Sequence, residues 1–263
     1  MGVDYVVDLE CSPKEALGVQ GIVDLLKARS RAEYVRDMMR AGGDTRPLAE
    51  LTFETMVLRP DGPQRETVSV QSLFQRAAAL DEHAAACEGC EARCRPQAFG
   101  CVGYVSYPVR SSSEAWLLDQ LPVDLDSAAG TLLTSAFADF GWDGSFTRHL
   151  RAQGDTFFEA HEATPRRWGD GFTLSSDQIW HMLFGLGHLA PAHSMMCSLF
   201  MGVVPHHIGA EGLAQLSQDT ARLGGHALRY DVEHEDHQLA ELARFFRAMG
   251  LAAALNVSLL IDG

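Results

Sequence analysis

The sequence of 263 residues has few lysines and no long apolar run. Lys14 and Lys27 are its only lysines, so arginine carries nearly all of the positive charge, a preference that we attribute to codon bias in a GC-rich genome. The longest apolar stretches, residues 195–204 and 251–261, have about half of the roughly 20 residues that a membrane-spanning helix needs. We therefore expect no membrane span.

The first residues also lack the features of a targeting signal. Residues 1–4 have neither the basic nor the apolar segment of a secretory signal peptide, and Val6 stands where N-myristoylation needs Ser or Thr. Six cysteines without such a signal favour a reducing compartment, where closely spaced cysteines bind metal or do redox chemistry more often than they form structural disulfides. We expect a soluble, intracellular, cytoplasmic protein.

Basic residues are too scattered for nucleic-acid binding. The net charge of -14 repels phosphate backbones, and the densest basic spots are two pairs, Arg29 with Arg31 and Arg166 with Arg167. Neither pair is long enough to follow a phosphate backbone. The sequence therefore predicts no nucleic-acid and no membrane partner, and leaves a protein partner open.

The composition is typical of a globular protein, because 46 % of the residues are apolar and 21 % are charged. The length fits a single domain, residues 1–263, with a weak boundary signal near residues 122–126 that would separate 1–121 from 127–263. We predict an α+β fold with a mixed N-terminal half and a mostly helical C-terminal half.

Periodicity and capping signals predict the individual elements. In the N-terminal half we expect strands at residues 3–9 and 102–109, a β-hairpin of residues 51–58 and 66–70, and helices that begin at Ser12 and Ser30 and that cover residues 72–86 and 114–121. In the C-terminal half we expect helices at residues 127–139, 176–190, 192–203, 212–223 and 232–249, and a final strand at residues 256–261.

Four cysteines, Cys87, Cys90, Cys94 and Cys101, lie within fifteen residues. Four thiolates suit a tetrahedral zinc ion, and a Cys-x-x-Cys step lets two sulfurs bind from one tight turn. Gly89 can adopt the positive φ that such a turn often needs. The spacing therefore predicts a four-cysteine zinc knuckle. An iron–sulfur cluster is the alternative, although the gaps differ from both ferredoxin patterns, and a metal-free redox cluster is a third. Because four thiolates fill every zinc position, we expect the metal to be structural.

The eleven histidines suggest a second site in the C-terminal half. His234, His237 and Glu241 share one face of a predicted helix, where two imidazoles and a carboxylate could hold a divalent ion. Asp177 precedes His181 by one helical turn and could orient its imidazole. His188 lies two turns beyond His181, and further histidines flank the next predicted helix: His193, His206 and His207. The alternative is that these are ordinary surface histidines with no binding role.

No catalytic motif accompanies these clusters. The sequence has no Gly-x-Ser-x-Gly elbow, no phosphate-binding Gly-x-x-x-x-Gly-Lys loop and no Gly-x-Gly-x-x-Gly fingerprint, so we assign no catalytic residue. The first hypothesis is a metal-binding interaction or regulatory protein with a structural zinc site. The alternatives are a metal-dependent hydrolase that uses the histidines, and an iron–sulfur electron-transfer or sensing protein.

Overall fold

The structure, a computed structural model, describes residues 2–59, 62–169 and 171–262. Its internal contacts divide the chain into two compact units. The sheet unit comprises Met1–Leu9 and Glu91–Gly263, and the hairpin unit comprises Glu10–Cys90. Residues 122–126 lie inside the sheet unit, and the single-domain interpretation stays a prediction.

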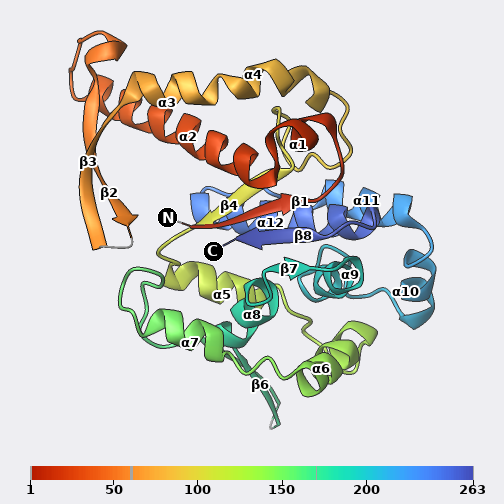
Figure 1. Cartoon of the computed structure of the whole chain (residues 1–263). Coiled ribbons are helices and arrows are strands. Elements are labelled where there is room, and N and C mark those ends of the chain that lie inside the picture. The colour runs from red at the N-terminus through yellow and green to blue at the C-terminus, as the bar shows by residue number, and fades with distance from the viewer. Residues whose placement is uncertain (1, 60–61, 170, 263) are drawn as a thin grey trace. The chain divides into compact units, whose positions relative to one another are not determined.

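The sheet unit is built on a four-stranded antiparallel sheet with the order β4-β1-β8-β7 (Figure 1). These strands are β1 (Gly2–Val7), β4 (Val102–Ser106), β7 (His188–Leu189) and β8 (Leu259–Asp262). The inner strand β1 is buried from Val3 to Val7, and all of these residues except Asp4 are apolar, so the strand does not alternate as a half-exposed strand does. Every pairing joins segments that are far apart in the sequence.

Helix α12 (His237–Ala254) packs along one face of this sheet, behind β1 and β8 in Figure 1. It begins at Asp236, whose side chain accepts hydrogen bonds from the backbone amides of Gln238 and Leu239. The Tyr5 ring contacts Phe245 edge to face, with 5.2 Å between the ring centroids. Gly103 lies opposite Tyr5 in β4, and a Cβ there would come within 2.3 Å of the Tyr5 ring. Glycine is therefore required where this ring crosses the sheet.

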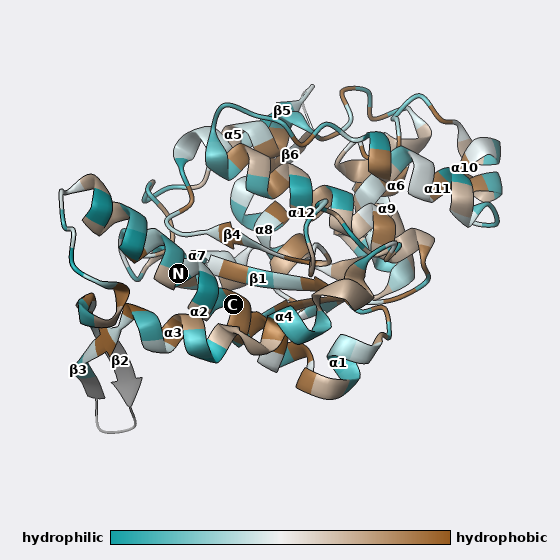
Figure 2. Ribbon diagram, turned by 90° about the horizontal axis from the view of Figure 1, so that it is seen from above, coloured by the Kyte–Doolittle hydropathy of each residue, from teal (hydrophilic) through white to brown (hydrophobic). Residues whose placement is uncertain are grey.

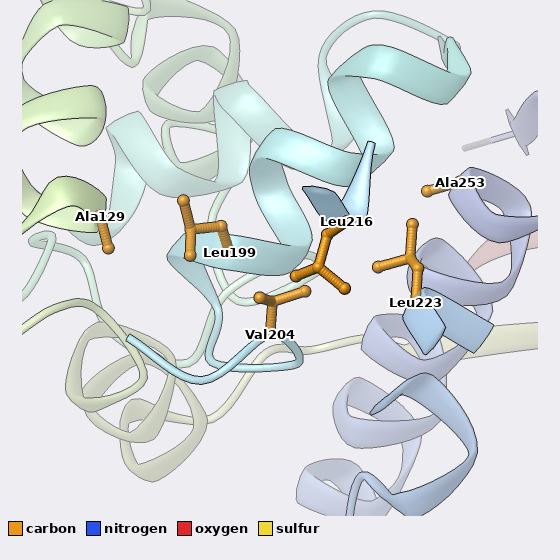
Figure 3. Close-up of a cluster of buried hydrophobic side chains, with 6 residues drawn as sticks. All are labelled: Ala129, Leu199, Val204, Leu216, Leu223 and Ala253. Carbon is orange, nitrogen blue, oxygen red and sulfur yellow. The ribbon is translucent and has the colours of Figure 1, made fainter. Parts of the chain in front are cut away.

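Short helices and one small hairpin complete the sheet unit. They are α5 (Ser111–Asp119), α6 (Ala128–Phe140), α7 (Ser145–Arg151), β5 (Pro165–Trp168), β6 (Phe172–Ser175), α8 (Ser176–Phe184), α9 (Pro191–Phe200), α10 (Ala210–Leu216) and α11 (Thr220–Arg229). Figure 3 shows six buried side chains from α6, α9 to α12 and the turn after α9: Ala129, Leu199, Val204, Leu216, Leu223 and Ala253.

The hairpin unit combines one long helix with a two-stranded antiparallel hairpin. Its elements are α1 (Ser12–Leu17), α2 (Val19–Ala41), η1 (Leu48–Glu50), β2 (Thr52–Arg59), β3 (Gly62–Ser69), α3 (Val70–Ala77), α4 (Ala79–His83) and η2 (Ala84–Cys87). Figure 2 shows teal and brown residues alternating along α2, whereas β1 of the sheet unit is mostly brown. The buried side of α2 packs Ala32 and Val35 against Leu51 and Val70.

The α+β class is confirmed, and so is the hairpin, whose predicted turn includes Pro60 and Asp61 outside the described residues. The helix start at Ser30 is wrong, because α2 continues through it to bury Ala28 and Ala32 on one face. The helix predicted at residues 176–190 is too long. It ends at Gly185, and residues 188–189 pair with β8 instead.

The predicted metal centre is also wrong. Among the residues that the structure describes, no group of three or more His, Cys, Asp or Glu side chains is placed to hold a metal ion. Cys87, Cys90, Cys94 and Cys101 therefore do not form a zinc or iron–sulfur site, and the four-cysteine knuckle is absent from the fold. Close spacing along the chain therefore did not indicate a shared metal ion. The same finding removes the interaction protein with a structural zinc site, the metal-dependent hydrolase and the iron–sulfur protein as hypotheses.

Candidate functional site

Of the three residues predicted to share one helix face, His234, His237 and Glu241, only His237 and Glu241 contact each other. His237 Nδ1 lies 3.0 Å from Glu241 Oε1, an ion-pair distance, and the His237 side chain is 70 % exposed. The other oxygen of Glu241 accepts hydrogen bonds from the amide and the hydroxyl of Ser106, at 2.8 and 2.6 Å. His234 precedes α12, and its ring packs against Trp116. The two hydrogen bonds from Ser106 to Glu241 anchor the end of β4 to α12.

The predicted pairing of Asp177 with His181 does not form. The backbone amide of Gly144 donates to His181 Nδ1 at 3.2 Å, and Asp143 Oδ1 lies 3.6 Å from the same nitrogen. Asp177 instead accepts from Arg151. The neighbouring histidines also have separate surroundings, because His193 stacks on Trp142 and His206 Nε2 lies 3.2 Å from the carbonyl oxygen of Phe200.

Asp177 lies beside two other buried ionisable side chains, Arg151 and Glu114. We call these three residues the charge cluster. These side chains come from α7, α5 and α8 and are 5, 0 and 3 % exposed. Arg151 Nη1 donates to Glu114 at 3.2 Å and to the carbonyl oxygen of Ala160 at 2.7 Å, and Nη2 donates to both carboxylates. Nε donates to Asp177 at 3.1 Å. All five N–H groups of the guanidinium are thus used.

Local structure fixes each member of the charge cluster. The Ser176 hydroxyl donates to Glu114 Oε1 at 2.6 Å. Asp177 stands in the first turn of α8, where the helix dipole favours a negative charge. Ser175 and Gln178 hold this turn with a reciprocal capping box. Burial alone would lower the pKa of Arg151, but the hydrogen bonds and charges of the two carboxylates outweigh burial and raise its pKa.

A cavity of about 670 Å³ lies beside the charge cluster. Its walls come from α7, from the segment before β5 and from the start of α8: Arg148, Arg151, Ala152, Gly154, His161, Glu162, Ala163, Ser175 and Asp177. This volume is within the range of small-molecule sites, about 300–1,000 Å³. The cavity therefore combines room for a ligand with acidic and basic side chains on its wall.

Sequence reasoning missed most of this site. Helical spacing relates Asp177 to His181, and no sequence pattern distinguishes Glu114 or Arg151. These two residues are 37 positions apart and belong to no motif. The one usable signal was the capping box at the start of α8, which places Asp177 at a helix N-terminus.

A second hollow, of about 500 Å³, contains the basic pair noted in the sequence, Arg166 and Arg167. The Arg166 guanidinium lies over the Trp168 ring and donates to the backbone carbonyls that follow α5, among them those of Leu121 and Pro122. Burial lowers the pKa of Arg166. Arg166 therefore satisfies carbonyl oxygens just after α5. Because its guanidinium is already used in this way, the first cavity is the better candidate for a ligand.

Comparisons of the chain with protein-family models, with curated proteins and with solved structures found no match. No helix in the described part of the chain has the length and apolar character needed to cross a membrane. The cavity beside the charge cluster is the feature of the described residues with the clearest chemistry for binding a ligand.

Proposed function

We propose that the sheet unit binds a small molecule with a positively charged amine in the cavity beside the charge cluster. The observation that carries the proposal is an imbalance of charge. Two buried carboxylates, Glu114 and Asp177, share the single guanidinium of Arg151, and Asp177 lines the cavity. When both carboxylates are ionised, the cluster has one negative charge in excess, which a cation in the cavity would neutralise.

The free oxygen of Asp177 is the atom expected to meet the amine. Both bonds from Arg151 to Asp177 end on Oδ1, which leaves Oδ2 for a ligand. An ammonium donates three hydrogen bonds, and a charge pair at about 4 Å interacts by about 4 kcal/mol at the effective dielectric constant of a site near the protein surface. Glu162, also on the cavity wall, would add a second counter-ion.

Arg148 sets a preference among amines. Its guanidinium donates to the carbonyl oxygen of Asp143 at 2.6 Å and lies 4.0 Å from the Asp143 carboxylate. Among the described residues its other N–H groups have no hydrogen-bond partner, so they can meet an acidic group on the opposite end of a ligand. We therefore infer that a zwitterion, with an amine toward Asp177 and a carboxylate toward Arg148, binds more tightly than a simple amine.

Titration calorimetry with a matched set of ligands tests the proposal. The set contains an alkylamine, the alcohol and the carboxylic acid of the same chain length, and the corresponding amino acid. We expect the amine and the amino acid to bind, the amino acid more tightly, and the alcohol and the acid not to bind. Binding of the acid with no binding of the amine would contradict the proposal.

Two charge-matched variants locate the binding site. Glu162→Gln removes a carboxylate from the cavity wall and should weaken amine binding about two- to fivefold, in line with the loss of one charge contact near the surface. Glu235→Gln removes the same charge from an exposed position outside the cavity and should leave the affinity unchanged. Equal effects of the two substitutions would place the amine elsewhere.

A further inference from the structure

Two of the four clustered cysteines stand at the two ends of one tight turn in the hairpin unit. The amide of Cys90 donates to the carbonyl oxygen of Cys87 at 3.3 Å. Glu88 has φ -65° and ψ 129°, and Gly89 has φ 71°. These angles define a type II β-turn, which needs a positive φ at its third residue. Nothing lies within 4 Å of a Cβ added to Gly89, so glycine is required there by backbone conformation alone.

We propose that Cys87 and Cys90 form a redox modification site, in which the reduced dithiol is converted to a disulfide across the turn. A β-turn brings its first and fourth Cα atoms to within about 7 Å, and a disulfide spans Cα atoms about 4.4–6.8 Å apart. The turn therefore holds the two backbone positions within the range of Cα separations that a disulfide can span. This inference is independent of the amine site.

The exposure of the two cysteines determines the order in which their thiols react. Cys90 is partly exposed, whereas Cys87 is 8 % exposed. The Cys90 thiolate attacks a small-molecule disulfide, which forms a mixed disulfide and releases one small thiol. The Cys87 thiolate then attacks the Cys90 sulfur, forms the protein disulfide and releases the second small thiol. Two protein thiols lose two protons and two electrons, and one small disulfide is reduced to two thiols.

The charge of Glu88 should make the site select among oxidants. This exposed carboxylate stands inside the turn, next to Cys87 in the sequence. It repels an anionic disulfide and attracts a cationic one. We expect cystamine to oxidise the pair faster than the uncharged hydroxyethyl disulfide, and oxidised glutathione to be the slowest.

Trypsin digestion of the whole protein, followed by mass spectrometry, shows which cysteines the oxidation has joined. Cleavage after Arg76 and Arg93 releases residues 77–93, which contain Cys87 and Cys90 and no other cysteine. Cys94 and Cys101 fall in the next peptide, residues 94–110, since the Arg95–Pro96 bond resists trypsin. After oxidation with cystamine and alkylation, we expect peptide 77–93 to be unalkylated and lighter than the reduced peptide by two hydrogen atoms. A cross-link between the two peptides, a stable mixed disulfide on Cys90, or two unreacted thiols in peptide 77–93 would each overturn the proposal.

Two variants test the mechanism with the same readout. Cys87→Ser should stop the reaction at the mixed disulfide on Cys90. Gly89→Ala disfavours the positive φ of the turn, so it should slow ring closure at least several-fold while the first attack by Cys90 keeps its rate. Unchanged closure in Gly89→Ala would show that the turn does not direct the reaction.

Discussion

Two histidines of the sheet unit bury a ring nitrogen that has no hydrogen-bond partner among the described residues, namely Nε2 of His193 and Nε2 of His226. The His193 ring stacks on Trp142, with 5.3 Å between the ring centroids. Burial, together with the nearby His188, lowers the pKa of His193. Burial also lowers the pKa of His226 and of His206. Each of the three is therefore harder to protonate in the folded protein than in the unfolded chain.

We expect the free energy of unfolding to decrease as the pH is lowered. An unfolded histidine has a pKa of about 6.5, so between that value and the lower folded value the unfolded chain binds more protons. The stabilisation from these neutral histidines is complete above about pH 7 and is lost as the pH falls through about 6.5 toward the folded pKa values. Urea unfolding at a series of pH values measures this dependence.

One substitution assigns part of the effect to His193. His193→Phe keeps an aromatic ring against Trp142 and removes the proton-binding group, so it should flatten the pH dependence of stability. His149→Gln changes an exposed histidine of α7 and should leave the dependence as it is. A steep, unchanged dependence in His193→Phe would contradict the assignment.

At the scale of elements, the charge cluster joins three helices that are far apart in the sequence. Glu114 of α5 and Asp177 of α8 both bind Arg151 of α7, whose guanidinium lies 4.2 Å from the centroid of the Phe158 ring. An intact buried ion pair contributes little net stability, because desolvation offsets the attraction. The loss of one partner is costly, because the remaining charges stay buried without compensation.

Arg151→Met should therefore lower the free energy of unfolding by about 3–5 kcal/mol. Arg148→Met, at an exposed position of the same helix, should change it by less than about 1 kcal/mol. Adding Glu114→Gln to Arg151→Met should restore part of the stability, since it removes one of the unpaired charges. Chemical denaturation of the three variants checks this, and equal stability of Arg151→Met and Arg148→Met would refute the role of the cluster.

The sequence predicts those elements that local chemistry defines. The helix expected at residues 127–139 forms as α6, with the Ser127 hydroxyl accepting from the amide of Gly130 at its N-terminus, and α8 begins at Ser176 as expected. Gly185 and Gly187 mark the early end of α8 locally, because glycine commonly ends helices, but the pairing of residues 188–189 with Leu259 and Leu260 of β8 has no local signal. The charge cluster depends on similar long-range contacts. The predicted cysteine site is wrong for the opposite reason, because cysteines that are close along the chain need not converge on one metal ion.

For the whole molecule, the net charge of -14 favours the approach of cations and opposes that of phosphate backbones. Because salt screens charges beyond about 10 Å at 0.1 M, amine binding should weaken as the salt concentration rises. Calorimetric titrations at several salt concentrations measure this trend. An affinity for the amine that does not change with salt would indicate apolar binding instead. For the same reason we expect no binding of duplex DNA at physiological salt.

A crystal structure of the protein with the bound amino acid shows where the amine lies and so tests the proposed binding mode. We predict that the ammonium nitrogen lies within about 3 Å of Asp177 Oδ2, at ordinary hydrogen-bond distance, with the ligand carboxylate directed toward Arg148. An amine bound outside the cavity, or one turned so that its carboxylate meets the charge cluster, would contradict the account.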